Sequence, residues 1–411
     1  MPRFLPLPFS HFDWTNPDLL PDRTASPPYD VLSPAQRQEL AGKSPCNMVH
    51  IDLPGSYPEA DRLLGQWLDQ GQVVPDEPAY YIMATRFSLE SEEDQVLTRW
   101  GVFGGLQLSP WGQEGVYPHE KTYAKAKTDR LELMRATRAQ LSPIFGVFDD
   151  PGLDLNAMGR EVADLTDPLA VYHEGQVSHH LWRLPPKFEQ TLAKSLAGRE
   201  VYIADGHHRY ETALNYQAER GPGGGHKPWD FVFACLCNLA MPGVVIEPYH
   251  RVIVKAGSRD FPEALAKARA VFDVRAMKDL SELADSPVEA AFALEFGGAM
   301  HLLQPKTAQG LNPGQAAFAR IGAYIAAKDF LLPCLGLSEA DLSSAEILRY
   351  TASVAEARQA LAQGQAEAAL YLKPVSMDVI RQVSKLGQTM PRKSTYFYPK
   401  VPTGLILHIF R

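Results

Sequence analysis

Gly198-Arg199-Glu200-Val201-Tyr202-Ile203-Ala204-Asp205-Gly206-His207-His208-Arg209-Tyr210-Glu211-Thr212-Ala213-Leu214 is the stretch around which the chain is organised. Its apolar, β-branched run from Val201 to Ala204 predicts a buried strand, and Asp205-Gly206 is a turn signal. From Arg209 to Tyr216 apolar residues recur at helical spacing. The stretch therefore predicts a strand, a tight turn and a helix.

The turn itself favours the binding of an oxyanion or a phosphate. Gly206 lets the backbone approach a ligand closely. The first amides of the helix and the positive end of its dipole point at the same place. His207 and His208 add donors, and Arg209 can hold a phosphate with two parallel hydrogen bonds. The other interpretations of this stretch are a polar helix start, a metal site or a chance pattern. Asp205 has three possible roles: a Mg²⁺ ligand, a group that orients a histidine, or only a turn residue.

Composition limits the classes of protein to consider. The chain has 411 residues, enough for two or three subdomains, with 45% hydrophobic and 21% charged residues, as in ordinary globular proteins. The net charge of −8 argues against a broad nucleic-acid-binding surface, so we expect no duplex DNA partner.

The cysteines and the N-terminal segment indicate a cytoplasmic protein. The chain has four cysteines, Cys46, Cys235, Cys237 and Cys334, and they form no CxxC pair. This pattern indicates reduced thiols in the core and argues against a structural zinc site. The first twenty residues lack the continuous apolar core of a signal peptide, and no apolar run is long enough to cross a membrane.

The rest of the chain alternates helical and strand patterns, which predicts a mixed α/β fold. Expected strands lie at residues 47–52, 79–89, 98–108, 142–148, 170–172, 178–183, 231–240, 368–372 and 404–409. Expected helices lie at residues 33–41, 57–70, 188–196, 261–272, 313–329, 343–363 and 377–386, and a basic helix containing Arg130 ends near residue 140.

Other polar segments supply further candidate site residues. Tyr29 and Asp30 follow two prolines, so they either contact a small molecule or form only a rigid surface turn. A second set of candidates stands in segments rich in proline and aromatic residues: His119, Glu120, His250, Arg251, Lys393, Ser394 and Thr395.

Six spaced motifs together resemble one family, the domain of unknown function 1015, over nearly the whole chain. They are Pro27-Pro28-Tyr29-Asp30-Val31, Pro118-His119-Glu120-Lys121-Thr122, Ser142-Pro143-Ile144-Phe145, Ala204-Asp205-Gly206-His207-His208-Arg209-Tyr210, Pro248-Tyr249-His250-Arg251 and the segment from Met390 to Lys400. The resemblance implies no assigned activity.

A more distant resemblance carries a function. Pro118-His119-Glu120, a helix, Pro143-Ile144 and then Asp205 to Arg209 are similar to the motif order of the ParB/sulfiredoxin-like superfamily, which includes kinases of free serine. The resemblance implies a nucleotide-binding core with the phosphates of ATP or ADP on the Asp205–Arg209 box. It also implies that Glu120 is the base for the substrate hydroxyl. The segment between Pro143-Ile144 and Asp205 is longer here than is usual in those proteins.

These residues lead to one preferred function and two alternatives. We expect a nucleotide-dependent phosphotransferase or nucleotide hydrolase acting on a small hydroxylated metabolite such as serine. A ParB-like nucleotide-gated DNA-binding protein and a non-enzymatic nucleotide or metabolite sensor are the alternatives. We expect Glu120, Asp205 and His207 to be catalytic, with Mg²⁺ at Asp205. The phosphates are expected on Gly206, His207, His208, Arg209, His119 and Arg130, and the substrate on Tyr29, Asp30, His250, Arg251, Lys393, Ser394 and Thr395.

The same resemblance implies three regions along the chain. Residues 1–110 are expected to form an N-terminal α/β region, and residues 111–255 the ParB/sulfiredoxin-like nucleotide-binding core. Residues 256–411 are expected to form a C-terminal α/β region that packs on the core.

Overall fold

A computed structural model of the chain describes all residues except 1, 123, 222, 225–226, 258 and 307–310. The chain folds into two compact units. The first comprises Met1–Pro118, Thr122–Val244 and Pro399–Arg411, and the second His119–Lys121 and Val245–Tyr398. The predicted division into residues 1–110, 111–255 and 256–411 stays a prediction.

In the described chain, the first unit is built on one sheet whose strand order is β6-β11-β8-β12-β5-β4-β10-β9, with β1 also paired to β5. The β11–β6 and β12–β8 pairs are parallel and the other pairs are antiparallel, so the sheet is mixed. The strands are β1 (Phe4–Leu5), β4 (Tyr81–Leu89), β5 (Glu92–Gln107), β6 (Val116–Tyr117), β8 (Ile144–Phe148), β9 (Ala170–Glu174), β10 (Val177–Arg183), β11 (Val201–Asp205) and β12 (Phe231–Asn238).

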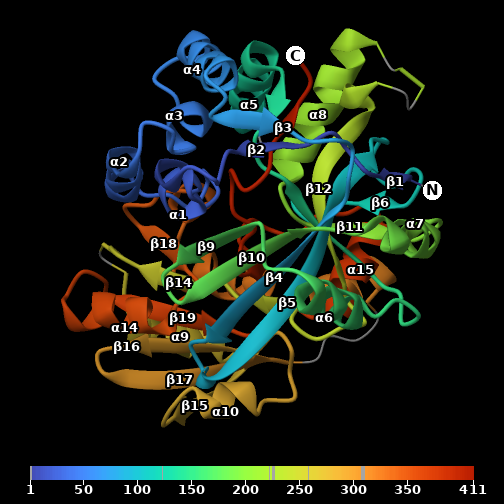
Figure 1. Ribbon diagram of the computed structural model, residues 1–411. Helices are drawn as coiled ribbons and strands as arrows, with labels where there is room; N and C mark the ends of the chain where they lie inside the picture. The colour runs from blue at the N-terminus through green and yellow to red at the C-terminus, as the bar shows by residue number, and fades with distance from the viewer. Residues whose placement is uncertain (1, 123, 222, 225–226, 258, 307–310) are drawn as a thin grey trace. The chain divides into compact units, whose positions relative to one another are not determined.

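Helices surround this sheet, and α5 packs against both α4 and α8 (Figure 1). The α-helices are α1 (Pro21–Thr24), α2 (Pro34–Lys43), α3 (Val49–Asp52), α4 (Tyr57–Asp69), α5 (Ala124–Thr137), α6 (Leu155–Leu165), α7 (Glu189–Leu196) and α8 (His207–Arg220). Short 3-10 turns lie at η1 (Pro17–Leu19), η2 (Pro186–Phe188) and η3 (Pro228–Asp230). Two small pairs complete the unit, β2 (Ser10–Phe12) with β3 (Val73–Pro75) and β7 (Ala139–Gln140) with β21 (His408–Ile409).

The second unit has its own sheet, of order β15-β17-β16-β19-β14-β18 in the described chain. Its strands are β14 (His250–Ile253), β15 (Phe272–Met277), β16 (Phe292–Phe296), β17 (Ala299–Pro305), β18 (Leu348–Thr351) and β19 (Ala368–Leu372), and β13 (Val245–Glu247) pairs with β20 (Tyr396–Tyr398). Its helices are α9 (Phe261–Ala268), α10 (Ser281–Ala284), α11 (Pro313–Phe318), α12 (Gly322–Ile325), the π-helix η4 (Ala326–Leu331), α13 (Glu339–Leu342), α14 (Val354–Ala362) and α15 (Met377–Lys385).

The predicted mixed α/β class is confirmed, and so are most of the predicted elements. The strand–turn–helix centre is present as β11 and α8, and the strands expected at 79–89 and 98–108 are present as β4 and β5, which pair antiparallel. The cysteines Cys46, Cys235, Cys237 and Cys334 are all free and buried, as predicted. No helix among the described residues is long and apolar enough to span a bilayer.

Three element predictions are wrong. Residues 49–52 form helix α3, because Asn47 Oδ1 accepts the Val49 amide at 3.1 Å and favours a helical start over the expected strand. The predicted helix at 343–363 contains strand β18, whose residues pair with β14. Of the predicted strand at 404–409 only β21 forms, because only that part meets β7.

Candidate functional site

The centre of the first unit is the turn between β11 and α8. Gly206 adopts φ +89°, a left-handed conformation that side chains disfavour, and α8 begins at the next residue. A Cβ at Gly206 would lie 3.1 Å from Ile144 Cγ2 and 3.1 Å from Arg209 Nε. Glycine is therefore required here twice, by the backbone angle and by the close packing. The predicted tight turn is confirmed.

Asp205 is the last residue of β11, and its carboxylate contacts two cationic side chains. Arg209 Nη2 lies 2.5 Å from its Oδ2, and Lys400 Nζ binds its Oδ1. All three side chains are largely buried, with exposed fractions of 11–13%. Burial alone would raise the pKa of Asp205, but Lys400 and Arg209 outweigh it and hold that pKa well below its usual range. Two cations face one carboxylate, which leaves this cluster with one net positive charge at the N-terminus of α8.

Arg209 connects two of the sequence motifs. Besides Asp205, its guanidinium donates to the carbonyl oxygen of Pro143, in the loop before β8. Both Nη atoms thus have partners within the protein, so Arg209 orients the carboxylate and fixes this loop. The guanidinium has five N–H donors, so a phosphate on Arg209 would use those that these two bonds leave.

His207 is buried at the start of α8 and His208 is half-buried. The ring of Trp111 stacks on Tyr210 with centroids 4.2 Å apart, and it lies 6.5 Å from the ring of His207. The first turn of α8 therefore has an aromatic wall on one side, which the sequence did not predict.

Glu211, one turn into α8, gathers three donors. It accepts from Trp111 Nε1 at 2.8 Å and Thr122 Oγ1 at 2.6 Å, and Lys127 Nζ lies 2.7 Å away. Burial would raise the pKa of Glu211, but these hydrogen bonds lower it overall. The network attaches the end of the 118–122 motif and the start of α5 to α8.

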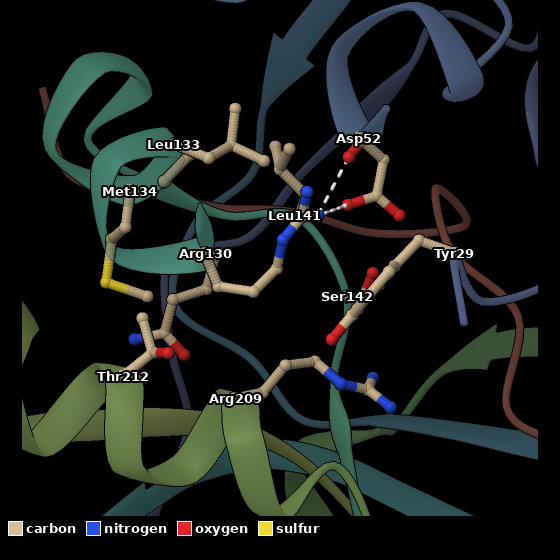
Figure 2. A pocket seen from close by; sticks show the side chains of 11 residues that line it. Tyr29, Asp52, Arg130, Leu133, Met134, Leu141, Ser142, Arg209 and Thr212 are labelled. Carbon is tan, nitrogen blue, oxygen red and sulfur yellow. Dashed lines mark hydrogen bonds and ion pairs between the residues drawn. The ribbon is translucent and has the colours of Figure 1, made fainter. Parts of the chain in front are cut away.

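A cavity of about 40 Å³ lies beside α8, among side chains from α3, α5, α8 and the Tyr29 segment (Figure 2). Arg130 of α5 donates to the carbonyl oxygen of Asp52 at 2.8 Å and to its Oδ1 at 2.9 Å. The guanidinium of Arg130 also lies 4.3 Å from the centre of the Tyr29 ring. Arg209 and Thr212 of α8 form another part of the wall. The cavity thus brings the predicted residues Tyr29, Arg130 and Arg209 together.

Tyr29 is half-buried, and burial raises its pKa to about 12, so it lines the cavity as a neutral phenol. Its neighbour Asp30 is exposed and does not line the cavity. Asp52, Thr212, Glu211 and Lys400 belong to the site but were not predicted as site residues. For Lys400 a signal existed, because it ends the motif that begins at Met390.

The second unit gathers another set of predicted residues. His119 Nε2 lies 2.8 Å from Thr395 Oγ1, with both side chains buried, and the Met390 amide donates to the His119 carbonyl at 2.8 Å. Glu120, which is half-buried, forms a parallel bridge with Met390. His119 and Glu120 are therefore side by side with the 390–395 motif in this unit.

Lys393 and Ser394 continue this arrangement. Lys393 Nζ donates to Tyr249 Oη at 3.3 Å and lies 4.5 Å from the centre of that ring. Ser394 Oγ donates to the Pro391 carbonyl at 2.7 Å. Lys393 also has φ +55°, a strained value for a non-glycine residue.

His250 and Arg251 lie in β14 and have structural partners. His250 Nδ1 accepts from the Leu372 amide at 3.2 Å, and burial lowers the pKa of His250 to about 4. Arg251 donates to the Tyr249 carbonyl, lies 5.2 Å from the centre of the Tyr350 ring, and has a pKa lowered by burial to about 10. Their predicted role in substrate binding stays a prediction.

The described residues contain no group of three or more His, Cys, Asp or Glu side chains that could hold a metal ion. At Asp205 both carboxylate oxygens already face cations. The surroundings of Asp205 therefore do not supply a complete Mg²⁺ site, and the predicted Mg²⁺ stays a prediction.

A family model described as "Protein of unknown function (DUF1015)" matches residues 7–328. No curated protein matches the chain in sequence. Among solved structures, a free serine kinase in complex with AMP has a TM-score of 0.37 and 15% identity, covering 74% of this chain and 92% of the kinase. SbnI from Staphylococcus aureus, truncated at its C-terminus, has a TM-score of 0.38 and 10% identity, with 74% and 85% of the two chains covered. A conserved hypothetical protein from Pyrococcus furiosus has a TM-score of 0.35 and 15% identity, with 74% and 95% covered.

Proposed function

Since the chain belongs to this family of proteins of unknown function, we propose its activity from its own site: it is a nucleotide-dependent phosphotransferase or nucleotide hydrolase. The acceptor is a small hydroxylated metabolite such as serine, and ATP or ADP is the phosphate donor. The sequence resemblance to the ParB/sulfiredoxin-like superfamily and the chemistry of the β11–α8 turn support this proposal.

One observation carries the proposal, the cluster of Asp205, Arg209 and Lys400 at the start of α8. The cluster has one net positive charge and is largely buried, so the charge is weakly screened by solvent. The N-terminus of a helix adds backbone N–H groups and a positive dipole end at the same place. Phosphoryl transfer depends on positioning and neutralising negative charge, which this arrangement supplies.

The nucleotide fits the turn by its phosphates rather than by its base. Gly206 leaves no side chain between the turn and a ligand, and His207 and His208 add ring nitrogens beside it. The neighbouring cavity of about 40 Å³ has room for only about three waters, so it does not take a nucleotide base. The phosphates are proposed to lie at residues 206–209, with Arg209 holding Asp205 in place.

Glu120 is the proposed base for the acceptor hydroxyl. It stands two residues before Thr122, whose hydroxyl donates to Glu211 of α8. A carboxylate in this role takes the hydroxyl proton or orients the attacking group. We therefore expect Glu120→Gln to abolish turnover while leaving nucleotide affinity nearly intact. Arg209→Ala is expected to damage both, because Asp205 then loses one of its two cations.

The test begins with the thermal stability of the full chain in ATP, ADP and CTP, with and without Mg²⁺. A ligand that binds the native state raises the melting temperature by mass action. Chromatography of reactions containing serine and the stabilising nucleotide then detects a phosphorylated product. Product formation lost in Glu120→Gln, with the thermal shift retained, supports the proposal.

Other outcomes lead to the alternatives. Nucleotide binding without product or hydrolysis for any hydroxylated acceptor would overturn the phosphotransferase and favour the sensor. A salt-resistant, sequence-dependent gel shift with duplex DNA would favour the ParB-like alternative, which the net charge of −8 argues against.

A further inference from the structure

The cavity beside α8 contains two buried polar atoms whose hydrogen-bonding capacity is unmet in the described chain. Asp52 is 4% exposed, and Arg130 takes only its Oδ1, so Oδ2 has no partner there. Thr212 is 1% exposed, and its Oγ1 likewise has no partner. An unmet buried carboxylate oxygen is costly, because it has lost its water without gaining a donor. Both residues line the same cavity (Figure 2).

Four other polar side chains of the cavity wall, those of Arg130, Arg209, Ser142 and Gln140, already have partners. Arg130 binds Asp52 and Asp129, and Arg209 binds Asp205 and the Pro143 carbonyl. Ser142 Oγ lies 2.7 Å from Thr403 Oγ1, and Gln140 bonds the backbone at both ends of its amide. The cavity therefore needs a hydrogen-bond donor, and it needs it at Asp52 Oδ2.

Charge decides which donor fits. Three carboxylates, Asp52, Asp129 and Asp205, balance three cations, Arg130, Arg209 and Lys400, so these six paired side chains together carry no net charge. A donor that is itself positive makes the strongest bond to a carboxylate oxygen. A ligand that pairs this positive group with a negative one keeps the surroundings neutral, since its anionic part can face the arginines.

Resting on the proposed function, we infer that the cavity selects acceptors carrying a primary ammonium group, with Asp52 Oδ2 as its counter-ion and Thr212 Oγ1 as a second partner. The acceptor class is thus compact hydroxylated amines that also carry a negative group, rather than neutral polyols or hydroxy acids. Asp52 is the specificity-determining residue, and the volume of about 40 Å³ limits the part inside the cavity to a few atoms.

The test measures binding by calorimetry for two probes of matched skeleton and the same configuration, L-serine and L-glycerate, which differ only in an ammonium or a hydroxyl group at one carbon. Each is titrated into the full chain alone and with ADP. We expect L-serine to bind roughly tenfold more tightly, as a charge-assisted bond to a buried carboxylate implies. Asp52→Asn is expected to reduce this ratio to about one, because the neutral amide no longer counters the ammonium charge.

Asp129→Asn is the matched control. It also removes a carboxylate from Arg130, but its side chain is 47% exposed and does not line the cavity, so the ratio should persist. Thr212→Val keeps the shape of the side chain and should weaken L-serine a few-fold, a loss typical of one hydrogen bond. If Asp52→Asn does not fold, Thr212→Val decides, and unchanged serine affinity in this variant contradicts the inference.

Equal affinity for both probes, binding of neither, or a ratio that survives in folded Asp52→Asn overturns the inference. Failure here is separable from failure of the proposed function, because ATP or ADP would still raise the melting temperature. Loss of that nucleotide response would instead count against the phosphate cradle.

Discussion

Lys400 binds the carboxylate of Asp205, although 195 positions separate the two residues along the chain. The bond makes a residue near the C-terminus part of the turn that begins α8. Together with Arg209 it gives that turn its net positive charge, which is the physical basis of the proposed phosphate site.

Removal of Lys400 tests this relationship. Lys400→Met should weaken nucleotide binding about tenfold and lower the free energy of unfolding by about 2 kcal/mol, because Asp205 keeps only one cation in a buried site. Calorimetry and urea denaturation measure the two effects. Lys187→Met is the control, since Lys187 is half exposed and pairs with Glu161 on the surface. Equal behaviour of the two variants would contradict the role of Lys400.

Comparing two glycine substitutions distinguishes the effect of a left-handed backbone on stability from the effect of the added side chain on ligand binding. Gly206 and Gly198 both have positive φ, but a Cβ at Gly198 meets nothing within 4 Å. Each change to alanine should cost about 1–2 kcal/mol of stability for the left-handed backbone. Only Gly206→Ala should also weaken nucleotide binding, because its Cβ displaces Arg209 and Ile144. Nucleotide titrations that give the same affinity for both variants would refute this.

The lowered pKa of the buried residue His250 predicts how the stability of the protein depends on pH. The folded-state pKa of His250 is lowered to about 4 from an ordinary 6.5. Because the unfolded chain takes up the proton first, the contribution of His250 to stability is full above pH 6.5 and falls by roughly 2–3 kcal/mol as the pH drops to 4.

His250→Asn should flatten that part of the curve, since its amide oxygen can accept the Leu372 N–H without titrating. Urea denaturation at several pH values measures this effect. An identical slope in wild type and His250→Asn would show that other groups cause the acid loss.

Substitution of Glu211 tests whether stability and turnover depend on the attachment of the 118–122 motif to α8. Glu211→Gln loses an acceptor for Thr122 and the charge partner of Lys127, so stability should fall by about 1–2 kcal/mol. Turnover should fall more than nucleotide affinity, because Thr122 follows the proposed base Glu120 closely. Glu219→Gln, on the same helix in an exposed pair with Arg135, is the control. Normal turnover in Glu211→Gln would show that this attachment is dispensable.

Local patterns in the sequence were sufficient for the centre of the first unit. The β-branched run, the Asp205-Gly206 turn and the helical spacing after it predicted β11 and α8, because strand and helix formation depend mainly on residues close in sequence. The same reasoning failed at Asn47 to Asp52, where a strand was expected. There a single side-chain hydrogen bond from the Val49 amide to Asn47 favours a helix instead.

Only the tertiary structure determined which residues form pairs with one another within the site. The pairs Asp205–Lys400, Arg130–Asp52 and Glu211–Thr122 join residues 195, 78 and 89 positions apart, and no local propensity encodes such partners. Sequence can supply a buried aspartate or lysine, but its charge partner depends on how the chain closes. For that reason Gly206 was predictable from the turn it makes, whereas the unmet oxygen of Asp52 became visible only once α3, α5 and α8 enclosed a cavity.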